Sequence, residues 1–95
     1  HWVFAIFDEG LSTAQIYEKT DDMRGLEFEG EPEVPTELLS ALARGDAPAL
    51  GRLLHNDLQL AATTSRPQLG RVLEQGIDLG ALGAIISGSG PTCAF

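Results

Sequence analysis

The segment Ser87-Gly88-Ser89-Gly90-Pro91 contains the residue types and spacing that most clearly allow chemistry. Glycine has no Cβ atom and can adopt positive φ, so successive backbone N–H groups can turn inward and form a concave anion site. The same freedom also suits a simple turn between two strands. On the residues alone, a binding role and a purely structural role for Gly88, Ser89 and Gly90 both stay open.

The other side chains with catalytic potential are expected to have structural roles. His1 and His55 have no acid or nucleophile at a recognisable catalytic spacing, and His55 is expected at a helix end. Asp8 and Glu9 are adjacent, and adjacent strand residues face opposite sides of a sheet, which favours a turn over a paired-carboxylate site. Cys93 alternates with apolar neighbours and has no adjacent cation, so it is predicted to be a buried thiol.

An α+β fold, with strands packed against a layer of short helices, is predicted to position these residues. The apolar run 2–7 predicts a strand buried on both faces, with Trp2 in the core. Two more short strands are predicted at 84–87 and 92–95, around the glycine segment. Caps, prolines and leucine spacing predict helices at 36–44, at 46–54 and from Pro67 to Gly76. Asn56 and Gln59 have cap spacing and predict one more helix, with Asn56 as its cap.

A further helix is predicted directly after the first strand. Ser12 and Gln15 have capping-box spacing, and Leu11 and Ile16 occupy the hydrophobic-staple positions, so the turn into this helix is strongly specified. This turn fixes the direction in which Tyr17 points. From spacing alone, the simpler interpretation of Tyr17 is an aromatic side chain packed at the helix edge with its hydroxyl in water.

The negative charge is concentrated in one segment. Between Asp21 and Glu37 there are seven acids and one base, Arg24, so this stretch carries −6 of the formal net charge of −8. Residues 20–35 also contain glycine and proline and are predicted to form an exposed acidic loop. The sequence has no basic stripe that could follow a phosphate backbone, which argues against nucleic-acid binding.

Composition also limits the cellular compartment and the kinds of site that are expected for this chain. A single cysteine excludes an internal disulfide, and no Cys/His cluster has zinc-site spacing, so no metal site is predicted and a reducing, cytoplasmic setting is expected. No apolar run reaches the ~20 residues of a membrane-spanning helix, and a signal peptide is not recognised. Both ends fall in predicted strands, so we expect part of a longer chain, with exposed edges that favour homo-oligomers.

Residues 83–95 resemble the third conserved motif of the GHMP-superfamily kinases, a glycine loop between strands that faces the active site. Homoserine kinases carry a similar loop. Residues 1–17 resemble the strand, turn and helix that open the second domain of the 4-diphosphocytidyl-2-C-methyl-D-erythritol kinases, and Asn56-Asp57-Leu58-Gln59 with Arg66-Pro67 and Leu69 resembles their central helical region. These matches cover most of the chain except the acidic loop.

The resemblance implies that residues 1–95 are a partial C-terminal kinase domain. The parent enzyme would transfer the γ-phosphoryl group of ATP to the 2-hydroxyl of 4-diphosphocytidyl-2-C-methyl-D-erythritol, in the non-mevalonate route to isoprenoid precursors. In that family an aromatic residue at the position of Tyr17 stacks on the cytosine ring, an interaction of about 1–3 kcal/mol per base. The resemblance thus implies that Tyr17 binds substrate and that Gly88, Ser89 and Gly90 lie near the active site.

The family's phosphate-binding loop and its catalytic aspartate and lysine lie upstream of the matched portion. No residue of this sequence therefore inherits a catalytic or metal-binding role, and ATP and Mg²⁺ are expected to bind mainly to an N-terminal domain outside it. The 95-residue chain alone is expected to be inactive.

Three other interpretations stay open. The chain could belong to a homoserine kinase or another GHMP kinase, because the glycine loop is shared. It could be a non-enzymatic interaction module whose acidic loop binds a partner, or a truncated chain with no function of its own. The assignment to the 4-diphosphocytidyl-2-C-methyl-D-erythritol kinases requires Tyr17 and the glycine segment to line the same cleft.

Overall fold

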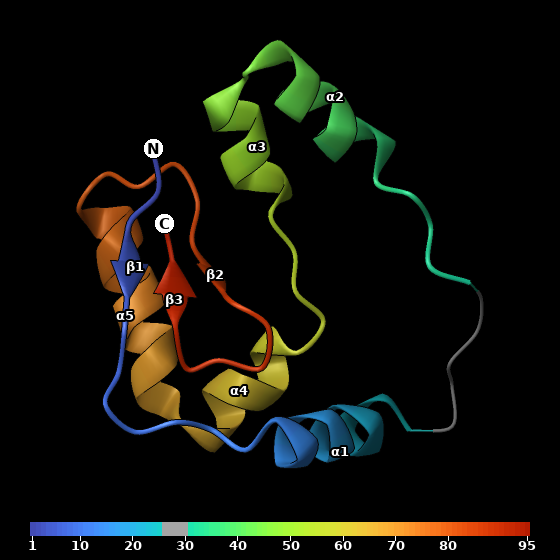
Figure 1. The fold of residues 1–95 in the computed structure, drawn as a ribbon, viewed down its shortest axis with the longest axis vertical. Coiled ribbons are helices and arrows are strands. Elements are labelled where there is room, and N and C mark those ends of the chain that lie inside the picture. The colour runs from blue at the N-terminus through green and yellow to red at the C-terminus, as the bar shows by residue number, and fades with distance from the viewer. Residues whose placement is uncertain (26–30) are drawn as a thin grey trace.

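The described part of the chain, residues 1–25 and 31–95 of the computed structural model, forms three short strands and five helices (Figure 1). In chain order these are β1 (Phe4–Ala5), α1 (Thr13–Arg24), α2 (Thr36–Arg44), α3 (Ala47–Leu53), α4 (Gln59–Ser65), α5 (Pro67–Asp78), β2 (Ile85–Ile86) and β3 (Cys93–Ala94). The predicted α+β class is confirmed.

The three strands form one antiparallel sheet in the order β1-β3-β2. Ala94 lies opposite Phe4 on one side and Ile85 on the other, so the last strand is central and joins the first strand to the β2–β3 hairpin. Helices α4 and α5 lie beside this sheet, and α1 crosses near the end of α4 (Figure 1). The sheet therefore brings the two ends of the sequence together, at the end of the hairpin opposite the glycine segment (Figure 1).

The core lies between the sheet and helices α1, α4 and α5. Ala61 and Ala62 of α4 are buried, and their small side chains let this helix pack closely in the core. Leu69 is the largest fully buried side chain of α5. Ile86 and Cys93 face these helices from β2 and β3. The buried cluster consists of Ile16, Ala61, Ala62, Leu69, Leu73, Ile86 and Cys93.

The prediction of a first strand buried on both faces is wrong. The strand comprises only Phe4–Ala5, and Trp2 and Ile6 are 51% and 81% exposed. Only one face of β1 meets the core: Ala5 and Phe7 pack against the buried cluster, whereas Phe4 on the other face is exposed. Among the described residues, nothing covers the opposite face of β1 sufficiently to bury it.

Two predicted boundaries also differ from the structure. Helix α1 continues to Arg24, so the acidic loop does not begin at Thr20; the buried Thr20 hydroxyl donates to the Ile16 carbonyl at 2.8 Å. Residues 31–35 are exposed and have no helix or strand, whereas Glu27 and Glu29 lie outside the described residues. Helix α5 continues through Gly76 instead of ending there, and the glycine leaves room for the ring of Phe95, with which a side chain at this position would collide.

Helices α2 and α3 form a hairpin that stands away from the sheet (Figure 1). The predicted α2 ends at Gly45 as expected, but Leu42 on its predicted apolar side is 53% exposed. Asp46 caps α3 by accepting from the Ala49 N–H at 3.0 Å. Helix α3 meets the segment before β2 at a contact between two glycines, where a Cβ at Gly51 would lie 2.1 Å from the Leu82 carbonyl oxygen.

Candidate functional site

The glycine segment forms the turn of the β2–β3 hairpin. The Ser87 N–H donates to the Thr92 carbonyl at 2.8 Å, and the Gly90 N–H donates to the Ser87 carbonyl at 3.0 Å. Gly88 and Gly90 have φ values of 58° and 80°. L-residues with a Cβ rarely adopt this region, so the turn depends on glycine at both positions.

The side chains of Asn56, which precedes α4, and of Gln59, the first residue of α4, hold this hairpin from outside. The Asn56 amide nitrogen donates to the carbonyls of Ile86 and Gly88 at 2.7 and 2.8 Å. The Gln59 amide oxygen accepts from the Ile86 N–H at 3.0 Å. The prediction of Asn56 as a helix cap is wrong, because α4 begins at Gln59 with Leu58 as its N-cap residue; the Asn56 oxygen accepts from the Leu58 N–H at 3.0 Å, in the turn before the helix. The bonds of Asn56 to the glycine loop were not predicted.

The helix that carries Tyr17 starts as predicted. The Ser12 hydroxyl accepts from the Gln15 N–H at 3.4 Å and caps α1. Arg66 fixes the preceding turn, because its guanidinium donates to the carbonyls of Glu9 and Gly10 at 2.8 and 3.1 Å. Asp8 and Glu9 are exposed residues of this turn, in agreement with the expected turn.

Tyr17 and the glycine segment belong to neighbouring elements. The hydroxyls of Thr13 and Ser89 lie 2.9 Å apart, within hydrogen-bonding distance, which joins the first turn of α1 to the glycine loop. Thr13 and Tyr17 are four residues apart and therefore share one face of the helix. The Tyr17 side chain is 54% exposed on that face. The geometry thus puts the two predicted binding elements on the same side of the molecule.

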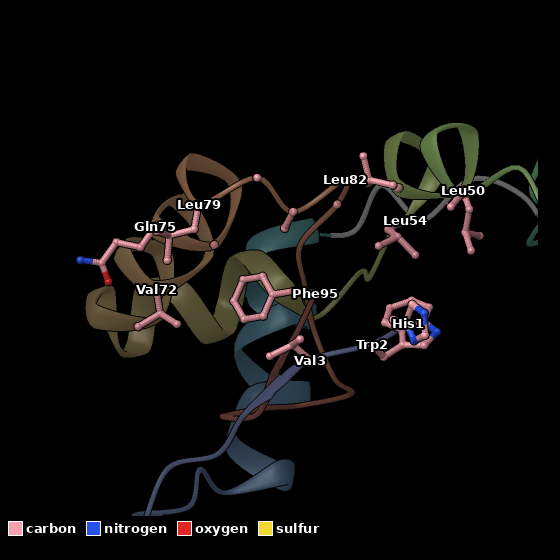
Figure 2. Close-up of a pocket in the computed structure, with 16 residues that line it drawn as sticks. His1, Trp2, Val3, Leu50, Leu54, Val72, Gln75, Leu79, Leu82 and Phe95 are labelled. Carbon is pink, nitrogen blue, oxygen red and sulfur yellow. The ribbon is translucent and has the colours of Figure 1, made fainter.

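A large apolar cavity of about 630 Å³ lies elsewhere, between α3, α5 and the ends of β1 and β3 (Figure 2). The predicted core residue Trp2 lines this cavity, together with Val3, Leu50, Leu54, Val72 and Phe95. A second, more polar cavity of about 560 Å³ lies between α2 and α3 and is lined by Arg44 and Arg52. Neither cavity includes Tyr17 or the glycine loop, so a shared cleft between those two elements stays a prediction.

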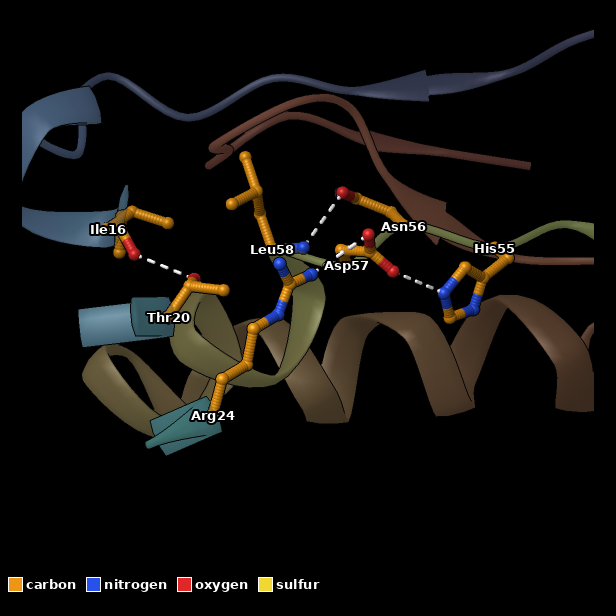
Figure 3. A network of polar contacts seen from close by, with 7 residues as sticks. All are labelled: Ile16, Thr20, Arg24, His55, Asn56, Asp57 and Leu58. Atoms are coloured by element: carbon orange, nitrogen blue, oxygen red, sulfur yellow. Dashed lines mark hydrogen bonds and ion pairs between the residues drawn. The ribbon is translucent and has the colours of Figure 1, made fainter. Parts of the chain in front are cut away.

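A polar network ties the end of α1 to the segment before α4 (Figure 3). The Asp57 carboxylate lies 2.9 Å from the Arg24 guanidinium and 2.6 Å from the His55 Nε2. The sequence analysis did not predict this contact of His55 with an acid, which the turn between the two residues brings about. Its position just after α3 agrees with the expected helix-end histidine. The network therefore links α1 to the segment that also carries Asn56, whose amide donates to Gly88 of the glycine loop.

The hydrogen bond from His55, followed by that from Arg24, holds the pKa of Asp57 below its usual 3.8. A carboxyl whose pKa is depressed by folding stabilises the fold above its unfolded pKa, and this contribution is lost as pH falls through the folded pKa. We therefore expect the Arg24–Asp57 link to be complete above 3.8 and to weaken at more acidic pH. An NMR titration of the Asp57 carboxyl carbon should give a midpoint below 3.8, shifted upward by His55→Ala. A wild-type midpoint at or above that value would contradict this.

Cys93 is fully buried, which confirms the prediction of a buried thiol. Burial raises the pKa of the thiol above its usual 9.0, so the reactive thiolate is scarce in the folded protein. We expect alkylation by iodoacetamide at about pH 8 to be slow in buffer and fast in denaturant, where the thiol has an ordinary pKa. Equal rates in the two solutions would show that Cys93 is accessible.

The described residues contain no group of three His, Cys, Asp or Glu side chains that could hold a metal ion. A helix with the length and hydropathy required to cross a bilayer is also not found among residues 1–25 and 31–95.

The family model of the GHMP kinase C-terminal domain matches residues 38–95, which include most of α2, all elements from α3 to β3 and the glycine loop. The chain therefore belongs to the GHMP kinases, as part of their C-terminal domain. Over its whole length it is 54% identical to the 4-diphosphocytidyl-2-C-methyl-D-erythritol kinase of Thermobifida fusca. Kinases of the same name from Cutibacterium acnes and Streptomyces avermitilis are 51% and 50% identical over 99% and 100% of the chain.

The chain spans about 30% of the length of these relatives. Both the superfamily and the narrower resemblance inferred from the sequence are confirmed by these comparisons. The similarity extends through the first 37 residues, which the family model does not match and which include Tyr17.

Proposed function

We propose that this chain is part of a kinase that transfers the γ-phosphoryl group of ATP to the 2-hydroxyl of 4-diphosphocytidyl-2-C-methyl-D-erythritol, a step in the formation of isoprenoid precursors. The observation that carries the proposal is the identity of about half of all positions with kinases named for this substrate. The glycine loop alone supports only the superfamily, because other GHMP kinases share it.

In this proposal, α1 and the glycine loop recognise the substrate. The exposed ring of Tyr17 provides a flat surface for the cytosine base, and stacking requires no particular set of hydrogen bonds. Gly88, Ser89 and Gly90 lie on the phosphate-bearing side of the same substrate. The 2.9 Å contact between Thr13 and Ser89 supports this arrangement, because it keeps the two elements adjacent.

We propose that ATP and Mg²⁺ bind mainly outside the described residues. The glycine loop leads into strand β3 and not into a helix N-terminus, so it lacks the helix that typically binds phosphate groups. No described cluster of acids could hold Mg²⁺. On the family resemblance, we assign ATP and Mg²⁺ to an N-terminal part of the longer kinase. We also propose that the 95-residue chain is inactive by itself and that the enzyme is cytoplasmic. Self-association through the outer edge of β1 remains part of the proposal, because β3 is central and the side chains of Asn56 and Gln59 occupy the outer edge of β2.

A competition assay with the full-length kinase tests the proposed substrate. Phosphoryl transfer from ATP is measured with the cytidyl substrate and homoserine present together at equal concentration. We expect the cytidyl substrate to be phosphorylated and homoserine to remain unchanged. Preference for homoserine would remove the proposed assignment, and transfer to neither compound would favour a non-enzymatic role.

A further inference from the structure

Asn56 lies where the segment between α3 and α4 meets the glycine loop, and it is half-buried. Its amide nitrogen donates to Ile86 and Gly88, and its oxygen accepts from Leu58. An asparagine amide offers two donors and an oxygen with two acceptor positions, so three of the four are used. All three bonds go to backbone groups, which means that Asn56 fixes the chain path more than it fixes other side chains.

These bonds complete the outer edge of the sheet. Strand β2 pairs with β3 on one side only, and on that side Ser87 donates to Thr92. Neighbouring residues of a strand point their backbone groups to opposite sides, so the N–H and carbonyl of Ile86 face outward. Gln59 accepts from this N–H and Asn56 donates to this carbonyl. Two side chains thus take the place of a fourth strand.

The bond from Asn56 to Gly88 extends this support into the turn itself. Gly88 has positive φ and open space around its Cα, so neighbouring side chains do not restrain it sterically. Gly90, in contrast, is packed, because a Cβ there would lie 3.0 Å from Ile86 and 3.5 Å from Leu11. The Asn56 amide is therefore the contact that fixes the exposed half of the loop, next to Ser89.

We propose that Asn56 is the positioning residue of the glycine loop, holding Gly88 so that Ser89 stays against Thr13 on the helix of Tyr17. The expected effect on catalysis rests on the proposed function, whereas the support of the glycine loop by Asn56 does not. Since a displacement of about 1 Å can lower a rate by roughly 100-fold, loss of this support should reduce kcat. Binding of the cytosine ring on Tyr17 should change little, because Arg66 and Ser12 hold α1 independently.

The test compares N56D with Q59E in the full-length kinase. Aspartate keeps an oxygen for the Leu58 N–H but presents a carboxylate to two carbonyl oxygens, so both loop bonds are lost. Glutamate at position 59 keeps the oxygen that accepts from Ile86. Each variant adds one negative charge beside β2, so the pair separates hydrogen bonding from charge.

For N56D we expect faster hydrogen–deuterium exchange of the Ser87 and Gly90 amides and a kcat lowered by roughly 10- to 100-fold, with KM for the cytidyl substrate within about threefold of wild type. Q59E should remain within about threefold of wild type in every measurement. Equal effects of the two variants, or unchanged exchange in N56D, would overturn the proposal.

The two proposals fail in different ways. A wild-type enzyme without activity on the cytidyl substrate would refute the proposed function, whereas the exchange measurement would still decide the role of Asn56. Should N56D fail to fold, N56S replaces it under the same criteria, because serine retains a single donor and cannot hold both carbonyls.

Discussion

Replacing Tyr17 by alanine is expected to raise KM for the cytidyl substrate by roughly 5- to 150-fold, which corresponds to the loss of about 1–3 kcal/mol of stacking on the base. Steady-state kinetics of the full-length kinase measure this change. KM for ATP should stay within about twofold of wild type, because Tyr17 lies on α1 and ATP is assigned to the part of the kinase outside this chain.

The matched control for this substitution is Tyr17→Phe. Phenylalanine keeps the aromatic face and removes only the hydroxyl, which is free to contact water because the side chain is 54% exposed. We expect its KM for the cytidyl substrate to remain within about threefold of wild type. Equal losses of affinity for ATP and for the cytidyl substrate in the alanine variant would count against a specific base contact.

Replacing Gly51 by alanine is expected to lower the free energy of unfolding by about 1–3 kcal/mol or more, the usual cost of overpacking. The added Cβ would lie 2.1 Å from the carbonyl oxygen of Leu82, and this neighbour is backbone that cannot rotate away. Helix α3 would have to separate from the segment before β2. Urea denaturation, compared by midpoint with the wild-type protein, measures the loss.

Gly70→Ala is the control in a second helix. A Cβ at Gly70 would meet only the Thr63 methyl group, at 4.0 Å, which is ordinary contact. Alanine favours a helix over glycine by up to about 1 kcal/mol, so this variant should be as stable as wild type or more stable. If Gly51→Ala unfolded at the same urea concentration as Gly70→Ala, the close glycine contact described for α3 would be wrong.

Local signals in the sequence predicted much of the secondary structure. Ser12 and Asp46 cap their helices with their own side chains, and Gly45 ends α2 in the left-handed conformation. These bonds join residues no more than a few positions apart, so spacing alone identifies them. The β2–β3 hairpin was predicted for the same reason, since its turn residues lie between its strands.

Features that depend on distant contacts could not be predicted in this way. Gly76 has the residue type of a helix end, yet α5 continues through it, and the ring of Phe95, 19 positions later, occupies the space that a side chain at Gly76 would need. Trp2 and Ile6 have the composition of a buried strand, but exposure depends on which element covers β1. Only the three-dimensional arrangement contains that information.

The candidate site shows the same division. Residue types and the family resemblance identified Tyr17 and the glycine segment, whereas the side chains that hold them in place emerged from the structure. Arg66 and Asn56 each bond to backbone carbonyls at least 30 residues away. Such long-range bonds leave no periodic pattern in the sequence. The sequence feature that pointed to Arg66 and to Asn56 was a polar side chain next to a short apolar helix.

An NMR titration of the full-length kinase with 4-diphosphocytidyl-2-C-methyl-D-erythritol tests most directly whether Tyr17 and the glycine loop form one binding site. The ring signals of Tyr17 and the amide signals of Gly88, Ser89 and Gly90 are followed in the same experiment. We expect both groups of signals to shift and to saturate with a single dissociation constant. Shifts confined to one group, with the other unchanged at saturation, would contradict the account.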